Sequence, residues 1–282
     1  MKEFKSFFKE VGGNEGTLCH HSTRLDTYGC GCAHDCKYCY AKSLLDFRGL
    51  WNPARPSVAS VEKIIRKLIK FKDYGKVIRL GGMTDCFQPI ERAYKVTYNT
   101  IKALNKLGIE YLIVTKSDLI ASDEYIAILD KELAHIQISV TTTDDQLSKT
   151  YEKATLPSKR IAAIEKLQRH GFDVQLRLSP FTPEYIDFDI LNGVQCDKLL
   201  VEFLRVNTWV KKWFDIDFSP YTWKHGGYQH LPLETKLQHL ARINWKGQLS
   251  ICEDVPEHYK YWEENVNKQK DDCCNLNKIK KQ

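Results

Sequence analysis

The sequence has no apolar stretch approaching the ~20 residues that a membrane-spanning helix needs. Its first twenty residues hold no continuous apolar segment either, so they do not look like a secretory signal. Long disorder is excluded as well, because 43% of the residues are hydrophobic and the net charge is only +6. We therefore expect a globular, cytoplasmic protein with no membrane partner. The mild basic excess is compatible with an anionic partner but does not require one.

Internal repeats, low-complexity tracts and long linkers are also missing. Short β-rich segments instead alternate with amphipathic helical patterns. We predict strands at residues 77–81, 111–115, 136–141, 174–178, 199–204 and 249–252. The helical patterns cover residues 58–71, 101–107 and 158–170. This alternation predicts an α/β fold with a parallel sheet, and six or seven βα units in about 230 residues favour a full or partial β/α barrel.

In parallel β/α folds the functional site lies at the carboxyl ends of the strands. In this sequence the predicted strand ends carry small, polar or charged residues that a hydrophobic core does not need. These residues are Gly81, Gly82, Thr84, Asp85, Lys116, Ser139, Arg177, Ser179, Glu202 and Arg205. We expect them to gather at one site.

Cysteine is unusually abundant, with ten residues in the chain. In a reducing compartment such residues are more often metal ligands or reactive thiols than disulfides. Cys32, Cys36 and Cys39 have the spacing CX3CX2C. Three thiolates on a tight loop can hold three irons of a [4Fe–4S] cluster and leave the fourth iron open to an external ligand. Because electron-transfer clusters usually have four cysteines, the spacing indicates a cluster that performs chemistry.

Two other interpretations of these cysteines remain. Structural zinc would need further ligands, and Cys30 would complete only an unusual CX1CX3CX2C set. A redox pair formed by Cys36 and Cys39 would leave Cys32 unexplained. The spacing favours iron–sulfur over zinc.

The motif and several later segments resemble one family. CX3CX2C with an aromatic residue, Tyr38, before the last cysteine resembles the signature of the radical S-adenosylmethionine (SAM) superfamily. The segment GGMTDCFQPIE at 81–91 is similar to GxxTDPYQPIE of the spore photoproduct lyase-like branch, and the residues at 114–117, 138–141 and 178–180 match its later strand ends in order. The resemblance extends from about Thr23 to Arg205.

This resemblance implies a partial (β/α)6-type parallel barrel. The radical SAM core would span residues 25–205, after an N-terminal lead of residues 1–24. A C-terminal extension, residues 206–282, would close the barrel and could contact the substrate.

The resemblance also implies cofactors and roles. Cys32, Cys36 and Cys39 would bind a [4Fe–4S] cluster, and SAM would chelate its fourth iron. The implied cofactor-binding residues are Tyr38, Gly81, Gly82, Thr84, Asp85, Lys116, Ser139 and Arg177. A flavodoxin- or ferredoxin-like donor would reduce the cluster. SAM would then break into methionine and a 5′-deoxyadenosyl radical, which abstracts a hydrogen atom from the substrate.

The substrate is less clearly indicated. Residues 209–230 interleave aromatic and basic side chains, which can stack on bases and neutralise phosphates. They can equally pack the barrel. We predict base modification or repair in nucleic acid, as the resemblance suggests. A radical SAM enzyme for a peptide or small metabolite is the alternative, and a non-enzymatic zinc-binding module is a more distant one.

The remaining cysteines also leave alternatives open. Cys252, Cys273 and Cys274, with or without Cys196, could bind a second cluster. Cys86, Cys273 or Cys274 could instead donate a hydrogen atom to a product radical, or these cysteines could simply pack.

The chain also departs from spore photoproduct lyase at one position. That enzyme has a hydrogen-donating cysteine just before the hydroxyl-rich run that ends in aspartate. Alignment through Thr84 and Asp85 places Gly82 there, and glycine has no S–H bond to donate. We therefore predict that this protein does not split spore photoproduct.

Overall fold

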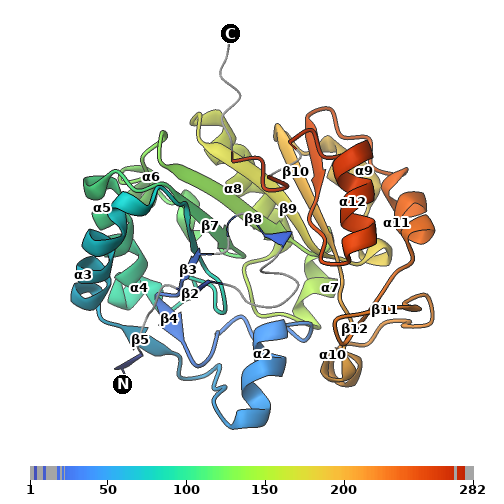
Figure 1. Ribbon diagram of the computed structural model, residues 1–282, viewed down its shortest axis with the longest axis horizontal. Helices are drawn as coiled ribbons and strands as arrows, with labels where there is room; N and C mark the ends of the chain where they lie inside the picture. Colours follow the sequence, from blue (N-terminus) through green and yellow to red (C-terminus); the bar gives the residue numbers. More distant parts are fainter. Residues whose placement is uncertain are drawn as a thin grey trace.

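The computed structural model describes residues 3–4, 9–10, 18–19, 21, 23–269 and 272–276. Within them, a curved eight-stranded sheet forms the centre of the protein (Figure 1). Its strands, in spatial order, are β13 (Gln248–Ile251), β10 (Lys198–Phe203), β9 (Asp173–Phe181), β8 (Ala134–Val140), β7 (Tyr111–Thr115), β6 (Ile78–Leu80), β3 (Thr23–Leu25) and β2 (Lys9–Glu10). Neighbouring strands from β13 to β3 are parallel, and β2 is antiparallel to β3.

The six predicted strands are all confirmed, with ends that differ by a few residues. The parallel sheet and its helices also confirm the predicted partial β/α barrel. The sequence reasoning missed β3, which adds a strand next to β6 through the pairs Arg24–Arg79 and Leu25–Leu80.

Three helices follow the amphipathic patterns in the sequence. In α3 (Val61–Phe71), Ile64 and Leu68 are buried against the core. This helix starts later than predicted, because residues 57–59 form strand β5 (Ser57–Ala59) and the Ser60 side chain accepts the first-turn N–H of Lys63. The other two are α5 (Val96–Leu107) and α8 (Pro157–Arg169), which agree with the predicted segments.

The remaining elements are short or lie at the ends of the sheet. The helices are α2 (Tyr40–Leu45), α4 (Glu91–Tyr94), α6 (Asp123–Ile126), α7 (Asp145–Lys149), α9 (Phe188–Gly193), α10 (Thr208–Trp213), α11 (Leu233–Leu240) and α12 (Pro256–Asn265). The 3-10 helices are η1 (Asp46–Arg48), η2 (Lys72–Tyr74), η3 (Asp118–Ala121) and η4 (Pro183–Tyr185). Strands β1 (Glu3–Phe4), β5 and β4 (Tyr28–Gly29) form a small sheet, and β11 (Trp223–His225) pairs with β12 (Tyr228–His230).

Helices cover the outside of the curved sheet, with α3 and α5 at one end and α9, α11 and α12 at the other (Figure 1). Strand β8 is buried along its whole length, as expected for a parallel strand with both faces covered. The central strands nevertheless bury polar side chains. Gln137 of β8 donates to Gln175 of β9 at 2.8 Å and accepts from Arg177 at 2.7 Å. Buried polar groups are costly unless they are paired, and the Gln175 Nε2 has no hydrogen-bond partner among the described residues, so the sheet interior carries polar groups that a purely hydrophobic core would lack.

The two flanking segments both contribute to the main sheet. The N-terminal lead supplies β2, although most of its residues lie outside the described part of the chain. The C-terminal extension supplies β13, which pairs with β10 from Lys198–Gln248 to Val201–Ile251. Along the described ranges, no helix has the length and hydrophobicity needed to cross a membrane.

Candidate active site

The CX3CX2C loop lies between β4 and α2 and is shaped by backbone contacts. The Asp35 N–H donates to the Cys32 carbonyl at 3.1 Å, and the Cys39 N–H donates to the Cys36 carbonyl at 3.2 Å. Asp35 has a left-handed φ of 43°, which lets the chain turn between these bonds. Gly31 has a φ of 151°, and a Cβ there would lie 2.0 Å from the Asn52 carbonyl oxygen. The three cysteines are thus held on a tight, locally determined loop.

The side chains of Cys32, Cys36 and Cys39 line one cavity. All three are free thiols, with Cys32 and Cys36 buried and Cys39 half-buried. Burial, with the nearby Asp85 carboxylate, raises the pKa of Cys32 to about 12, and burial with Glu152 raises the pKa of Cys36 well above its usual value. Without a metal these thiols are therefore protonated, and binding an iron–sulfur cluster must release their protons.

Tyr38, the aromatic residue of the motif, is fixed by a buried ion pair. Its hydroxyl donates to Glu152, which in turn pairs with Arg160. Burial opposes the charge on Glu152, but Arg160, Lys116 and the Tyr38 hydroxyl keep its pKa below the usual value. Arg160 also donates to the Ser139 carbonyl at 3.0 Å. The sequence reasoning missed Glu152 and Arg160, because on their own they look like ordinary helix-surface charges.

The segment after β6 forms the next part of the cavity wall. Gly81 has a φ of 83°, and a Cβ at this position would lie 2.5 Å from the Val114 carbonyl oxygen. The close passage of strand β7 therefore requires glycine here, in addition to any approach of SAM. Thr84 lines the same wall, but its hydroxyl donates to the Tyr28 carbonyl at 2.6 Å.

Asp85 links three parts of the site. Its carboxylate accepts from the Phe87 N–H at 2.8 Å, the Thr115 hydroxyl at 2.7 Å and the Lys116 N–H at 2.6 Å. The ring of His34, from the cysteine loop, lies 3.4 Å away. Burial works against the charge, but His34 and the backbone donors outweigh it and lower the pKa of Asp85 to about 2. These contacts assign Asp85 a positioning role, and its expected contact with SAM stays a prediction.

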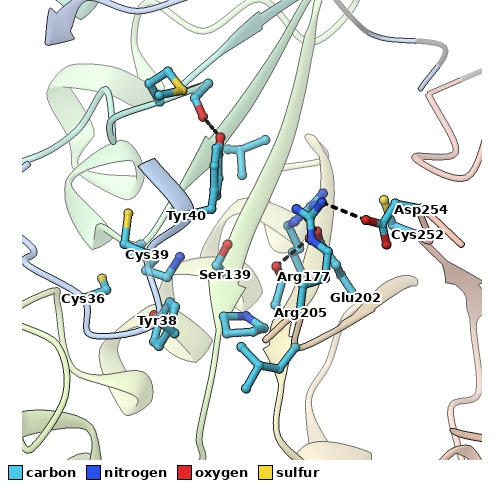
Figure 2. A pocket seen from close by; sticks show the side chains of 18 of the residues that line it. Cys36, Tyr38, Cys39, Tyr40, Ser139, Arg177, Glu202, Arg205, Cys252 and Asp254 are labelled. Carbon is cyan, nitrogen blue, oxygen red and sulfur yellow. Dashed lines mark hydrogen bonds and ion pairs between the residues drawn. The ribbon is translucent and has the colours of Figure 1, made fainter. Parts of the chain in front are cut away.

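A network of alternating charges forms the other side of the cavity (Figure 2). Arg177 pairs with Glu202, which also accepts from the Ser179 hydroxyl at 2.7 Å. Arg205 lies 3.4 Å from Glu202 and 3.3 Å from Asp254. Burial opposes the charge on Glu202, but Arg177 and Arg205 lower its pKa to about 2. The sequence reasoning did not single out Asp254, which follows the short strand β13.

The structure brings most of the predicted site residues together. In Figure 2, Cys36, Tyr38 and Cys39 lie on one side and Arg177 and Glu202 on the other, with Ser139 between them. The predicted residues that line the cavity are Cys32, Cys36, Tyr38, Cys39, Gly81, Gly82, Thr84, Asp85, Lys116, Ser139, Arg177, Ser179, Glu202, Arg205, Cys252, Cys273 and Cys274. The Lys116 ammonium lies 5.5 Å from the centre of the Tyr38 ring.

Two of the predicted cysteines do not line the cavity. Cys86 is fully buried in the hydrophobic core and does not line the cavity, because the chain turns inward after Asp85 and the Thr97 hydroxyl binds the Cys86 carbonyl at 2.6 Å. Cys196 lies near the amino ends of β9 and β10, where its thiol contacts the carbonyls of Val174 and Lys198. Neither cysteine therefore contributes to the cavity wall, and the predicted donor role of Cys86 stays a prediction.

The fit of an iron–sulfur cluster can be judged from the donors present. Cys32, Cys36 and Cys39 supply three soft sulfur ligands on one wall, and Cys30 does not line the cavity. Lys116 and Ser139 lie on the neighbouring strand ends. Three sulfur donors beside an open, polar space fit a [4Fe–4S] cluster whose fourth iron takes a ligand from outside the protein.

The family model of the radical SAM superfamily matches residues 27–187. The chain therefore belongs to the radical SAM superfamily, as the motif predicted, a family of enzymes that use a [4Fe–4S] cluster and SAM. An uncharacterized protein of Methanocaldococcus jannaschii is 32% identical over 169 residues, which are 58% of this chain and 62% of that protein. An uncharacterized protein of Mycobacterium tuberculosis is 26% identical over 185 residues, which are 60% of this chain and 52% of that protein. The chain thus covers less than two thirds of either relative.

Solved structures share the fold. Spore photoproduct lyase complexed with dinucleoside spore photoproduct gives a TM-score of 0.64 at 14% identity, covering 87% of this chain and 79% of that one. Streptococcus suis SuiB bound to the precursor peptide SuiA gives a TM-score of 0.55 at 15% identity. The match covers 81% of this chain and 48% of the SuiB chain. At such identities these likenesses describe the fold alone.

Proposed function

We propose that this protein is a radical SAM enzyme that acts on a base in nucleic acid. The observation that carries the proposal is a group of aromatic and cationic side chains on helices α2 and α10. The rings of Trp209 and Trp213 lie 5.5 Å apart with an interplanar angle of 32°. The Lys42 ammonium lies 4.8 Å from the centre of the Trp213 ring, and Lys212 lies 5.9 Å from that of Trp209.

These side chains belong to helices that border the cavity, although they do not line it themselves. Asn207, the N-cap residue of α10, and Val210 in its first turn both line the cavity. The Asn207 amide donates to the Ser43 hydroxyl at 3.3 Å, which ties α10 to α2. Figure 1 shows both helices on the same side of the sheet. Trp209 is adjacent to Val210 and keeps 36% of its surface exposed, although packing would bury it.

An exposed indole with nearby ammonium groups, such as Trp209, suits single-stranded or flipped-out bases. Stacking on an aromatic side chain contributes about 1–3 kcal/mol per base, and lysines neutralise the phosphates. The related folds include one bound to a dinucleoside lesion and one bound to a peptide. Of these two substrate classes, nucleic acid and peptide, the exposed Trp209 with its neighbouring lysine favours nucleic acid.

Cys32, Cys36 and Cys39 would hold the cluster, and Lys116 would orient the SAM carboxylate. When bound, the cluster supplies reductive cleavage of SAM to a 5′-deoxyadenosyl radical. Lys116 is suited to its role because its ammonium faces the cavity and rests against Tyr38. A flavodoxin- or ferredoxin-like protein as the electron donor remains a prediction.

On the other side of the cavity, the charged network would orient the substrate. Arg177 and Arg205 donate to Glu202, so this wall offers fixed donors and acceptors to a polar base edge. Because each charge already has a partner, the wall is rigid before substrate binds. The bound base would exclude water from the space between this wall and the cysteine loop.

Binding measured against salt tests the proposal. We expect the holoprotein to bind single-stranded DNA or RNA with an affinity that falls steeply as salt rises, because phosphate contacts release counterions. Trp209→Ala should weaken binding by about 5–150-fold, the equivalent of 1–3 kcal/mol. The matched lysine pair is Lys212→Ala, which should flatten the salt slope, and Lys246→Ala, which should not. Exposed Lys246 precedes the amino end of β13, whereas Lys212 follows the carboxyl end of the neighbouring parallel strand β10. Salt-independent binding of a peptide, with no nucleic-acid binding, would favour the other class.

A further inference from the structure

We propose that Cys19, Cys252, Cys273 and Cys274 bind a second iron–sulfur cluster in the same cavity. All four line the cavity with Cys32, Cys36 and Cys39. All four also lie outside residues 27–187, the part of the chain that matches the radical SAM family. Figure 2 shows Cys252 on the side of the cavity away from Cys36 and Cys39. We refer to these four residues as the distal cysteines.

The distal cysteines converge from both ends of the chain. Cys273 and Cys274 lie in one buried cluster with Cys252 packed against it, and Cys19 lines the same cavity. Cys273 and Cys274 are buried, and none of the four forms a disulfide. Four free sulfurs gathered in one part of a cavity are the ligand count of an ordinary [4Fe–4S] cluster.

Asp272 holds the turn that carries two of these cysteines. Its carboxylate accepts from the N–H groups of Cys274 at 3.0 Å and Leu276 at 2.7 Å. It also pairs with His21 at 2.8 Å, which ties the segment bearing Cys19 to the C-terminal turn. Lys198 donates to the Asn275 carbonyl at 2.8 Å. Cysteines that merely filled space would not need this polar framework around them.

Two arginines supply the charge that such a site requires. Arg79 and Arg177 line the same cavity as the distal cysteines, and Arg177 also pairs with Glu202. Arg79 lines the cavity, and its buried Nε has no hydrogen-bond partner among the described residues. A cluster with four thiolate ligands carries net negative charge, and burying that charge is costly without nearby cations.

The spacing of the sulfurs favours a cluster over a single metal ion. One tetrahedral Zn²⁺ with bonds of about 2.3 Å would hold its sulfur ligands about 3.8 Å apart. In the described part of the chain, no three cysteine sulfurs lie within 4.8 Å of one another. This holds for the distal cysteines and equally for Cys32, Cys36 and Cys39, which bind the family's cluster. The distal cysteines are therefore not gathered as tightly as a single tetrahedral ion requires.

Metal analysis of the full chain after anaerobic reconstitution with iron and sulfide tests this inference. We expect about eight irons per chain in the unmodified protein, since each [4Fe–4S] cluster holds four. The variant Cys32→Ala/Cys36→Ala/Cys39→Ala should keep about four irons and an EPR signal when reduced. The variant Cys273→Ser/Cys274→Ser should lose about half of the iron while SAM still perturbs the remaining cluster. Cys196→Ala is the matched control and should keep the full iron content.

Three results would overturn the inference. One is about four irons per chain in the unmodified protein, with no iron in a folded triple-alanine variant. Another is one zinc and no iron in that variant. The third is full iron content in the Cys273→Ser/Cys274→Ser variant. The iron count needs no substrate, so it is independent of whether the enzyme acts on nucleic acid.

Discussion

The cavity contains two groups of cysteines that are built in different ways. Cys32, Cys36 and Cys39 come from one short loop, whose backbone hydrogen bonds set their spacing. The distal cysteines come from both ends of the chain, and only the finished fold brings them together. Local spacing can therefore be recognised from sequence, whereas the distal site depends on β13 joining the sheet beside β10 and on the turn held by Asp272.

The largest effect that we expect is loss of SAM cleavage when a cysteine of the CX3CX2C loop, but not the neighbouring Cys30, is replaced. Replacing Cys32, Cys36 or Cys39 by alanine should abolish SAM cleavage, because the cluster loses one of its three sulfur ligands. Cys30→Ala should keep activity, since Cys30 does not line the cavity. Formation of 5′-deoxyadenosine in anaerobic assays with a reductant measures this. Loss of activity in Cys30→Ala with retention in Cys32→Ala would contradict the ligand assignment.

The second effect concerns the ion pair behind Tyr38. Glu152→Gln should lower the free energy of unfolding by about 3–5 kcal/mol, because Arg160 would remain charged and unpaired in a fully buried site. The double variant Glu152→Gln/Arg160→Met should recover part of this loss. Lys166→Ala is the control, since its partner Asp123 is 96% exposed. Denaturant unfolding checks the prediction, and equal stability of Glu152→Gln and the unmodified protein would refute it.

Asp85 should make the cysteine-loop side of the cavity sensitive to acid. Its pKa of about 2 lies below the unfolded value of about 3.8, so its contribution to stability is fully present above pH ~4 and is lost as the pH falls through the folded pKa. The shift corresponds to about 2 kcal/mol. Unfolding midpoints of Asp85→Asn and the unmodified protein should differ at pH 7 and converge toward pH 2. A gap that stays constant over this range would show that Asp85 does not carry the effect.

Replacing Lys116 should have a smaller effect, which is limited to the affinity for SAM. Lys116→Ala should weaken SAM binding by about 5–150-fold, because it removes a charge-assisted contact of 1–3 kcal/mol to the carboxylate. Lys153→Ala is the matched control, since Lys153 is 72% exposed and does not line the cavity. Equilibrium binding to the reconstituted protein distinguishes them. Unchanged affinity in Lys116→Ala would place the carboxylate elsewhere.

The last prediction is that the protein does not split spore photoproduct. Because Gly82 stands where spore photoproduct lyase has its donor cysteine, we expect no measurable splitting of spore photoproduct with SAM and reductant. Cys86 is buried and does not line the cavity. Cys273 and Cys274 line the cavity, so they remain the candidate donors if they do not bind metal. Efficient conversion of the lesion to two thymines would contradict this prediction.

Most of the fold could be predicted because its signals are local. The six strands and three helices are visible as short patterns of hydrophobic residues, and the CX3CX2C loop is visible as a fixed spacing of cysteines. Strand β3 was missed because three residues are too few to show alternation. Arg160 was missed because nothing in its own helix shows that Glu152, in the loop eight residues before it, will fold back to pair with it.

The distal cysteines show the same limit. Cys19 has no spaced partner nearby, and Cys196 was grouped with them only by residue type. Their placement depends on strand order, which brings residue 252 close to residues 19, 273 and 274 and leaves residue 196 at the other end of the sheet. Long-range pairing of this kind cannot be inferred from a single sequence.

The fate of deuterium tests the central claim most directly. The reconstituted protein would be given SAM, a reductant and either a deuterated oligonucleotide or a deuterated peptide, and 5′-deoxyadenosine would be analysed by mass spectrometry. We predict that deuterium from the oligonucleotide appears in 5′-deoxyadenosine, because the radical abstracts hydrogen from a bound base. Label that comes from the peptide, with only unlabelled product in the presence of the oligonucleotide, would contradict the account.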